Sequence, residues 1–261
     1  MIDVTEGTSP LLLGLPHTGT EVPAEIHARL NEAGRALIDT DWHIDRLYAG
    51  LVEGVSSVRM PVHRYVIDVN RDPDGRSLYP GQNTTDLIPM TDFDGLPIWR
   101  DGAAPGPEDV AARLEAFHKP YHAALSAQLA RIKRQHGFAL LYDCHSIRSN
   151  VPRLFEGTLP DFNIGTNDGA TAASEIETQV TRICHAAEGH TTAVNARFKG
   201  GWTTRHHGRP ETGIHAIQME LAQSAYLEAE APPWRYDPRR AEPLRRHLTR
   251  ILETLRDWRP A

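Results

Sequence analysis

Apolar residues along the chain fall into short unbroken runs and longer stripes at helical spacing. Short runs closed by Pro, Gly or charged residues are typical of buried strands. They predict strands at residues 11–15, 55–62, 65–69, 138–142, 191–194 and 214–221. Apolar stripes at helical spacing predict helices at 43–53, 108–135, 170–187 and 238–257. Pro120 lies inside the second of these helices and is expected to kink or split it.

Strands that alternate with long helices predict an α/β fold. We expect a layered domain with a central mixed, mostly parallel sheet flanked by helices. The sequence has no internal repeat and no clear linker, so a single domain over residues 1–261 is expected. Residues 72–107 are rich in Pro, Gly, Asp and Thr, and predict a long irregular excursion that could act as a lid. In such folds ligands bind beyond the carboxyl ends of the strands.

Composition and charge narrow the functional classes. The 261 residues are 40% hydrophobic and 24% charged, an ordinary globular mix. No apolar run approaches the roughly 20 residues that cross a bilayer. Asp3 and Glu6 stand where a signal peptide would carry basic residues, so we expect a cytoplasmic protein without a membrane role. A net charge of −6 disfavours nucleic acid as a partner, and Cys144 and Cys184 are expected to be free thiols.

His17 and His145, two of the 14 histidines, come just past the ends of predicted strands that carry apolar runs. His17 follows the run at 11–15 in a Pro-His-Thr-Gly turn, and His145 follows the run at 138–142. A histidine at the mouth of a buried strand is well placed as a metal ligand, and Asp143 could orient His145 from behind. The alternatives are a loop histidine that caps a helix, for His17, and a strand-end histidine that faces solvent, for His145.

Three acidic residues, Asp39, Asp41 and Asp45, gather before the helix expected at 43–53. Neighbouring carboxylates raise one another's pKa unless a cation neutralises their charge. A divalent metal ion bound between them would neutralise it. Asp41 and Asp45 are four residues apart, which puts them on one face of a helix. The alternative is an acidic helix start, with Asp39 and Asp41 as caps. This alternative covers Asp45 less well.

Two further segments could bind an anion. Asn70 and Arg71 follow the run at 65–69 and offer an amide and a guanidinium fork to a carboxylate. Alternatively, Arg71 pairs with a neighbouring aspartate to fix the loop. Residues 197–208 carry cations and histidines between glycines, which suits capture of a small anionic substrate, although a solvated basic loop has the same composition.

Glu220 lies within the apolar run at 214–221. Burial of a carboxylate is costly. It suits a general base whose pKa is raised toward neutral. The alternative is a structural salt bridge to a core arginine.

Together and in this order, these motifs resemble the N-formylglutamate amidohydrolase family. The resemblance covers residues 11 to about 226 and rests on segments 16–20, 39–48, 66–73, 143–146, 197–202 and 215–221. It implies a fold similar to that of zinc carboxypeptidases and aspartoacylases. It also implies zinc-dependent hydrolysis of N-formyl-L-glutamate to formate and L-glutamate, the last step of histidine degradation in many bacteria.

The resemblance places one zinc ion on His17 and His145. The carboxypeptidase pattern His-x-x-Glu would put an acid at position 20, where this chain has Thr20. The third ligand is therefore expected elsewhere. We expect Asp45, with Asp41 and Glu21 as alternatives. Other divalent metal ions remain alternatives to zinc, since two imidazoles and one carboxylate suit several of them.

The resemblance also assigns catalytic and substrate-binding roles. Glu220 matches the general base, and Asn70 and Arg71 match the pair that holds the substrate carboxylate. Because N-formylglutamate carries two carboxylates, further cations are needed. The expected set is Arg71, Arg205 and Lys199, with His206 beside them, and Arg71 or Arg205 is also expected to stabilise the oxyanion.

The chain departs from the family at Thr18, where the family often has Ser, and at His207, where it often has Tyr. The first departure should matter little, and the second leaves the role of segment 205–207 open. The nearest rival function is a related zinc amidohydrolase that acts on another N-acyl amino acid or a peptide end. A rival of another class is a non-catalytic paralogue that binds a metal or an amino acid. The oligomeric state cannot be read from the sequence.

Overall fold

One seven-stranded sheet runs through the part of the chain that the computed structural model describes, residues 1–78, 81 and 83–260. The strand order is β1-β3-β2-β4-β7-β5-β6. The strands are β1 (Asp3–Thr5), β2 (Leu11–Leu15), β3 (Ser56–Arg59), β4 (Ala139–Ile147), β5 (Phe162–Gly165), β6 (Thr192–Val194) and β7 (Ile214–Ala222). β1 on β3 and β5 on β7 are antiparallel, and the other pairs are parallel. The mixed, mostly parallel sheet expected from the sequence is confirmed.

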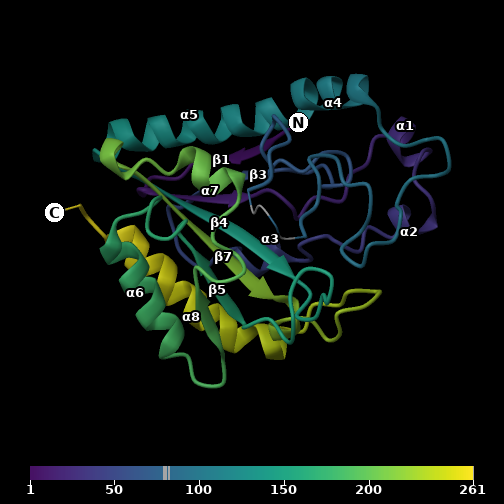
Figure 1. The fold of residues 1–261 in the computed structure, drawn as a ribbon. Helices are drawn as coiled ribbons and strands as arrows, with labels where there is room; N and C mark the ends of the chain where they lie inside the picture. Colours follow the sequence, from purple (N-terminus) through teal and green to yellow (C-terminus); the bar gives the residue numbers. More distant parts are fainter. Residues whose placement is uncertain (79–80, 82, 261) are drawn as a thin grey trace.

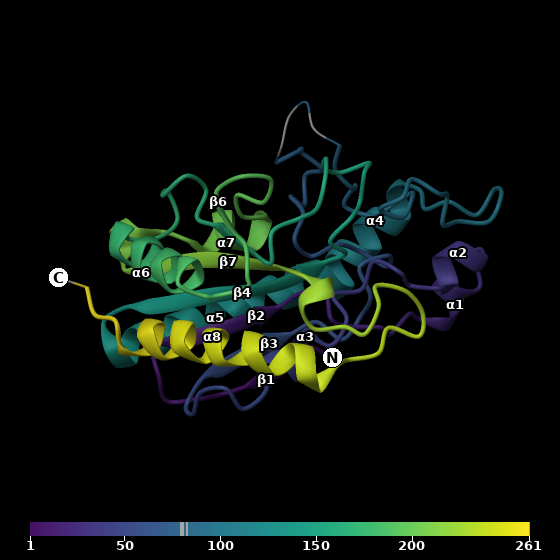
Figure 2. The same ribbon diagram turned by 90° about the horizontal axis from the view of Figure 1, so that it is seen from below.

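Helices cover both faces of this sheet (Figure 1). α5 (Lys119–His136) packs on one face, and α6 (Ser174–His185), α8 (Pro238–Asp257) and the short α3 (Ile44–Tyr48) pack on the other. Figure 2 shows α8 lying along its face of the sheet. The remaining α-helices of the described residues are α1 (Ala24–His27), α2 (Glu32–Arg35), α4 (Pro107–Arg113) and α7 (Trp202–His207). Over the described residues, we find no helix with the length and apolar character that a membrane span requires.

Alternation along β4 and β7 decides where their polar side chains lie. In β4, Leu141 packs in the core beneath α5, and Asp143 and His145 follow at two-residue steps. In β7, Ala216 packs in the same core, and Glu220 follows four residues later. Because side chains of a strand alternate between its two faces, all three polar groups project from the α5 face. In Figure 1, β4 and β7 run from upper left to lower right, so their carboxyl ends lie on the side of the molecule where α1 and α2 are drawn.

The helix expected at 108–135 forms with one distortion. α4 continues through a wide π turn (Leu114–His118) into α5, and Pro120 is the second residue of α5. Proline has no N–H to close a regular helical turn, so the wide turn accommodates it without ending the helix. The kink expected at Pro120 takes this form.

The structure differs from the expected elements in several places. Residues 65–69 form a buried turn instead of a strand, because their polar groups bond to side chains and loops rather than to a neighbouring strand. β4 extends to Ile147, so Asp143 and His145 lie inside the strand. Residues 202–207 form α7, where a loop was expected. β1 and β5 have no counterpart among the expected strands. Residues 72–107 are largely irregular, as expected, and 79, 80 and 82 lie outside the described residues.

Candidate active site

Three buried side chains meet at the carboxyl end of the sheet. His17 follows β2, Asp41 lies in the turn before α3, and His145 lies in β4. One ligand atom from each lies within 4.8 Å of the others. The backbone N–H of Asp41 donates to the backbone carbonyl oxygen of His17 at 3.1 Å, and this bond holds the turn against the end of β2. Two imidazoles and a carboxylate are ligands that zinc and related divalent ions take in proteins.

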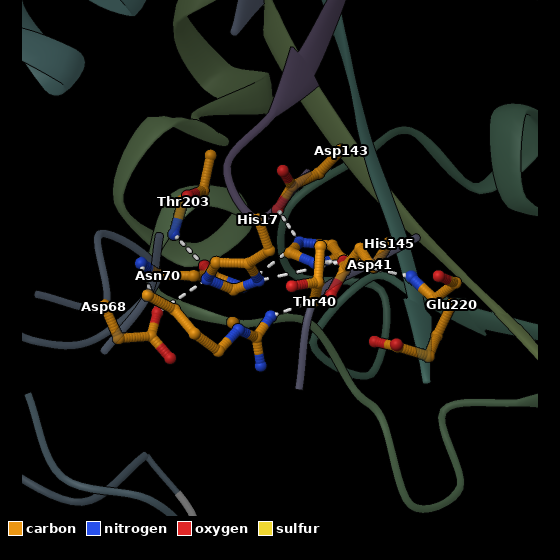
Figure 3. A network of polar contacts seen from close by, with 12 residues as sticks. His17, Thr40, Asp41, Asp68, Asn70, Asp143, His145, Thr203 and Glu220 are labelled. Carbon is orange, nitrogen blue, oxygen red and sulfur yellow. Dashed lines mark hydrogen bonds and ion pairs between the residues drawn. The ribbon is translucent and has the colours of Figure 1, made fainter. Parts of the chain in front are cut away.

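Each imidazole is held from behind by a second carboxylate (Figure 3). His17 Nε2 lies 2.7 Å from Asp68 Oδ1, and His145 Nε2 lies 3.1 Å from Asp143 Oδ2. The contact with Asp68 places the His17 ring proton on Nε2. Both Nδ1 atoms face Asp41, whose Oδ2 is 3.8 Å from His17 Nδ1 and 3.3 Å from His145 Nδ1. Asp143 thus lies behind His145, where the sequence suggested it.

The donor set fits a metal ion. Within the described residues, His17 Nδ1 is buried and has no hydrogen-bond partner, although it faces a carboxylate and a second imidazole. Buried polar atoms are nearly always paired. A pair of imidazoles with carboxylates behind them is the arrangement that fixes histidine ligands around a metal.

The structure does not bring Asp45 to the two histidines. Its side chain is 43% exposed and lies 3.6 Å from the Arg59 guanidinium. His43 has a left-handed backbone (φ of 59°), and α3 begins only after it, so Asp41 and Asp45 do not share a helix face. Glu21, the other alternative, is exposed. Asp41 therefore replaces Asp45 as the carboxylate beside the histidines.

Arg64 is a buried cation that the sequence analysis did not identify. Its Nη2 donates to Asp41 Oδ1 at 2.9 Å, and the side chain is 6% exposed. Burial alone would raise the pKa of Asp41, but Arg64 and the two histidines outweigh it and hold that pKa below its usual value. The only sequence signal for Arg64 is a charge at the start of the apolar run at 65–69.

The two histidines respond differently to their surroundings. Burial, followed by the charge of Arg64, lowers the pKa of His17 to about 4, so its imidazole is neutral at pH 7. Burial opposes protonation of His145 as well, but Asp143 and Asp41 outweigh it and raise the pKa of His145 well above its usual value. Metal ligands must be deprotonated, so binding of a cation here would release a proton from His145.

Glu220 lies beside this group, in the strand next to His145. It is 6% exposed, and burial raises its pKa to about 8 against the opposing charges of His145 and Arg64. Gln218 Nε2 donates to Glu220 Oε2 at 3.2 Å, while Gln218 Oε1 accepts the Gly201 N–H at 2.7 Å. Gln218 was also missed from the sequence, since its role depends on contact with α7. A buried carboxylate with a raised pKa is suited to accept a proton near neutral pH.

A pocket opens in front of these residues. Asn70 and Arg71 line it, as expected from the sequence. The Arg71 guanidinium donates to the carbonyl and hydroxyl oxygens of Thr85. The metal-ligand candidates His17 and His145 line the pocket together with Glu220. Its positive charge comes from Arg64, Arg71 and Arg197. Its apolar surface comes from Phe93, Ile147, Leu154 and Phe198.

Lys199, Arg205 and His206 are not among the described residues that line this pocket. Lys199 pairs with Asp168 at 3.0 Å, Arg205 donates to the Gly200 carbonyl oxygen, and His206 is exposed and stacks on Trp202. Because 202–207 form a helix, only the start of α7 faces the pocket, through Gly201. Among the cations of segment 197–208, Arg197 is the one that lines the pocket.

A mixed sheet with a buried His–Asp–His group and a buried glutamate at one pocket suits an enzyme of the hydrolase class. Residues 9–227 match the family model of N-formylglutamate amidohydrolase, and the chain belongs to this family. The resemblance that the sequence motifs indicated is thereby confirmed.

Relatives of known name cover nearly the whole chain. N-formylglutamate deformylase of Pseudomonas aeruginosa is 45% identical over 259 residues, 99% of this chain and 97% of the relative. The protein of the same name from Pseudomonas putida is 43% identical and covers 97% of this chain and 94% of its own length. The crystal structure of N-formylglutamate amidohydrolase from Ralstonia eutropha JMP134 superposes with a TM-score of 0.80 at 25% identity, covering 98% of this chain and 97% of that one.

Proposed function

We propose that this chain hydrolyses N-formyl-L-glutamate to formate and L-glutamate with the help of a bound divalent metal ion, of which zinc is the first candidate. The observation that carries the proposal is the buried group of His17, Asp41 and His145 beside Glu220 in an arginine-lined pocket. The names of the two Pseudomonas relatives support the choice of substrate. In a cell that forms N-formylglutamate from histidine, this reaction would complete histidine degradation.

His17 and His145 would hold the metal through Nδ1, and Asp41 through Oδ2. When bound, the metal would acidify a water molecule and polarise the formyl carbonyl group. Three protein ligands leave a position open for these oxygens. Asp68 and Asp143 keep the ring protons on Nε2, so that both Nδ1 lone pairs stay directed at the metal.

Glu220 is the proton carrier. Its carboxylate accepts a proton from the attacking water as the oxygen–carbon bond forms, and delivers a proton to the amide nitrogen as the carbon–nitrogen bond breaks. Gln218 fixes one carboxylate oxygen and thereby orients the other. The raised pKa makes both transfers accessible near neutral pH, since the acid and base forms are then of similar free energy.

Arg64 stabilises the negative charge that develops on the formyl oxygen. The guanidinium is already fixed by Asp41, so it needs no reorganisation when charge develops. Arg64 Nε is buried and lacks a partner among the described residues, and the side chain lines the pocket. Arg64 takes the role for which the sequence suggested Arg71 or Arg205.

The two carboxylates of the substrate are assigned to separate cations. Asn70 and Arg71 bind one, as the family resemblance implies, and Arg197 binds the other in place of Lys199 and Arg205. Arg197 is braced by the carbonyl oxygens of Leu154 and Asn83, which keeps its planar fork in the pocket wall. The apolar side chains between the cations suit the methylene groups of glutamate.

Formate release from N-formyl-L-glutamate tests the proposal. We expect release that a chelator stops and added zinc restores, and a Glu220→Gln control that is inactive although it retains zinc. A panel with N-acetyl-L-aspartate and a short peptide tests substrate choice, and faster turnover of either compound would overturn it. A folded, zinc-loaded sample that releases no formate would overturn the reaction itself.

A further inference from the structure

Three buried histidines that the proposed chemistry does not use lie behind the turn carrying Asn70 and Arg71. His118 ends the π turn before α5, His122 lies one helical turn further on, and His207 lies in α7. We name these three residues the histidine clamp. His118 Nε2 lies 2.9 Å from the Arg71 carbonyl oxygen, and His122 Nε2 lies 2.8 Å from that of Val69. Asn70 is therefore flanked on both sides by a backbone carbonyl that a histidine holds.

The contacts fix the proton positions in the clamp. A carbonyl oxygen only accepts, so His118 and His122 each carry their proton on Nε2. His122 Nδ1 is then an acceptor, and His207 Nε2 donates to it at 3.0 Å. The His122 ring, with one donating and one accepting nitrogen, is therefore neutral. Burial disfavours the charged form of all three rings, because it lowers the pKa of each of them.

The start of α7, the helix that carries His207, also binds Asn70. The Trp202 N–H donates to the Asn70 carbonyl oxygen at 3.3 Å, and the Thr203 N–H donates to Asn70 Oδ1 at 2.8 Å (Figure 3). A Cβ atom at Gly201 would lie 2.3 Å from Asn70 Nδ2, so only glycine permits this approach. The contact between His122 and His207 joins α5 to α7 behind the turn.

We propose that the histidine clamp positions Asn70 and Arg71 for the substrate. His118 and His122 are positioning residues that fix the backbone on either side of Asn70, and His207 sets the tautomer of His122. The inference rests on the proposed function in one respect, that Asn70 and Arg71 bind a substrate carboxylate. Side chains that bind a substrate are only as well placed as their backbone, and a displacement of about 1 Å can cost up to about 100-fold.

Kinetics of clamp variants test this role. His122→Leu removes the donor, whereas His122→Gln keeps an N–H at the reach of Nε2. Leu125→Ala, in the apolar core on the same helix, is the matched control for lost stability. With zinc-loaded enzymes, we expect KM for N-formyl-L-glutamate to rise about tenfold in His122→Leu while kcat changes less than about threefold, because a carboxylate is held equally in substrate and transition state. His122→Gln should recover most of the loss. An unchanged KM in His122→Leu, or an equal rise in Leu125→Ala, would overturn the positioning role.

Amide hydrogen exchange separates the clamp from the proposed function, since it needs no substrate. His122→Leu should accelerate exchange at residues 69–71 several-fold over wild type, and Leu125→Ala should not do so selectively. His118→Leu is the second variant, in case His122→Leu does not fold. Wild type that is inactive on N-formylglutamate would defeat the proposed function and leave this readout valid. Exchange at 69–71 that is unchanged in the clamp variants would overturn the clamp.

Discussion

His145 and Glu220 lie directly opposite each other in the neighbouring parallel strands β4 and β7. This pairing puts a proposed metal ligand and a proposed proton carrier on one face of the sheet, at the same level along it. A shift of one residue in the register of either strand would move one of them to the opposite face. Their proximity is therefore a property of strand register, set by the apolar residues that alternate with them.

Glu220→Gln should lower kcat by about 10² to 10⁴, the range that general acid–base catalysis contributes. The amide keeps the shape and the contact with Gln218 but cannot carry the proton. Formate release and zinc content, measured on the same preparation, distinguish this effect from loss of the metal. Retention of more than about a tenth of the activity would remove Glu220 from the role of general base.

Asp41→Asn should weaken zinc binding by more than about 100-fold, since ligand loss exceeds the loss of a supporting residue. Asp45→Asn should retain wild-type affinity, because Asp45 is half exposed and lies beside Arg59 rather than beside the histidines. Zinc titration of both variants against a competing chelator makes the comparison. The opposite pattern would restore Asp45 as the third ligand.

Asp68→Asn should weaken zinc binding about 10- to 100-fold without removing a ligand. The new amide can donate to His17 Nε2, which favours the tautomer with its proton on Nδ1, the atom that must face the metal. Asp86→Asn, at an exposed position, is the control. Equal affinity in wild type and Asp68→Asn would show that the Asp68 contact does not orient His17.

Arg197→Met should raise KM for N-formyl-L-glutamate at least about tenfold, since a hydrogen bond to a charged group is worth about 1.5–3 kcal/mol. The preference over N-formyl-L-glutamine, which lacks the second carboxylate, should shrink by a similar factor. Lys199→Met tests the assignment that the sequence suggested. A preference lost in Lys199→Met but kept in Arg197→Met would reverse the two assignments.

The sequence predicted the elements whose signal is local. Residues 238–257 form α8 as expected, because an amphipathic stripe over 20 residues needs no information from elsewhere in the chain. Residues 65–69 have the apolar run of a strand, yet they form a buried turn because Asp68 bonds to His17 and Val69 bonds to His122. Such partners lie about 50 residues away and leave no trace in the local pattern.

The candidate site divides in the same way. The positions of His17, His145 and Glu220 at one end of the sheet could be predicted, because parallel strands bring their carboxyl ends together. The choice of Asp45 over Asp41 depended on where a helix begins, which the left-handed backbone of His43 decides. Arg64 could not be predicted, because its role arises from contact with Asp41 across a fold that the local sequence does not specify.

Acidification should destabilise the fold through His207. Burial lowers its pKa from 6.5 to about 3, so between these values the unfolded chain binds a proton that the folded chain does not. The free energy of unfolding therefore falls as pH drops through 6.5 toward 3, by up to about 1.4 kcal/mol per pH unit for this one proton.

Urea unfolding at pH 7.5, 6.5 and 5.5 should show a shallower pH dependence in His207→Gln than in wild type. Leu125→Ala should lower stability at every pH without changing the slope, since it removes no titrating group. Parallel curves for wild type and His207→Gln would mean that the pKa of His207 is the same in the folded and unfolded chains, and would contradict the lowering by burial.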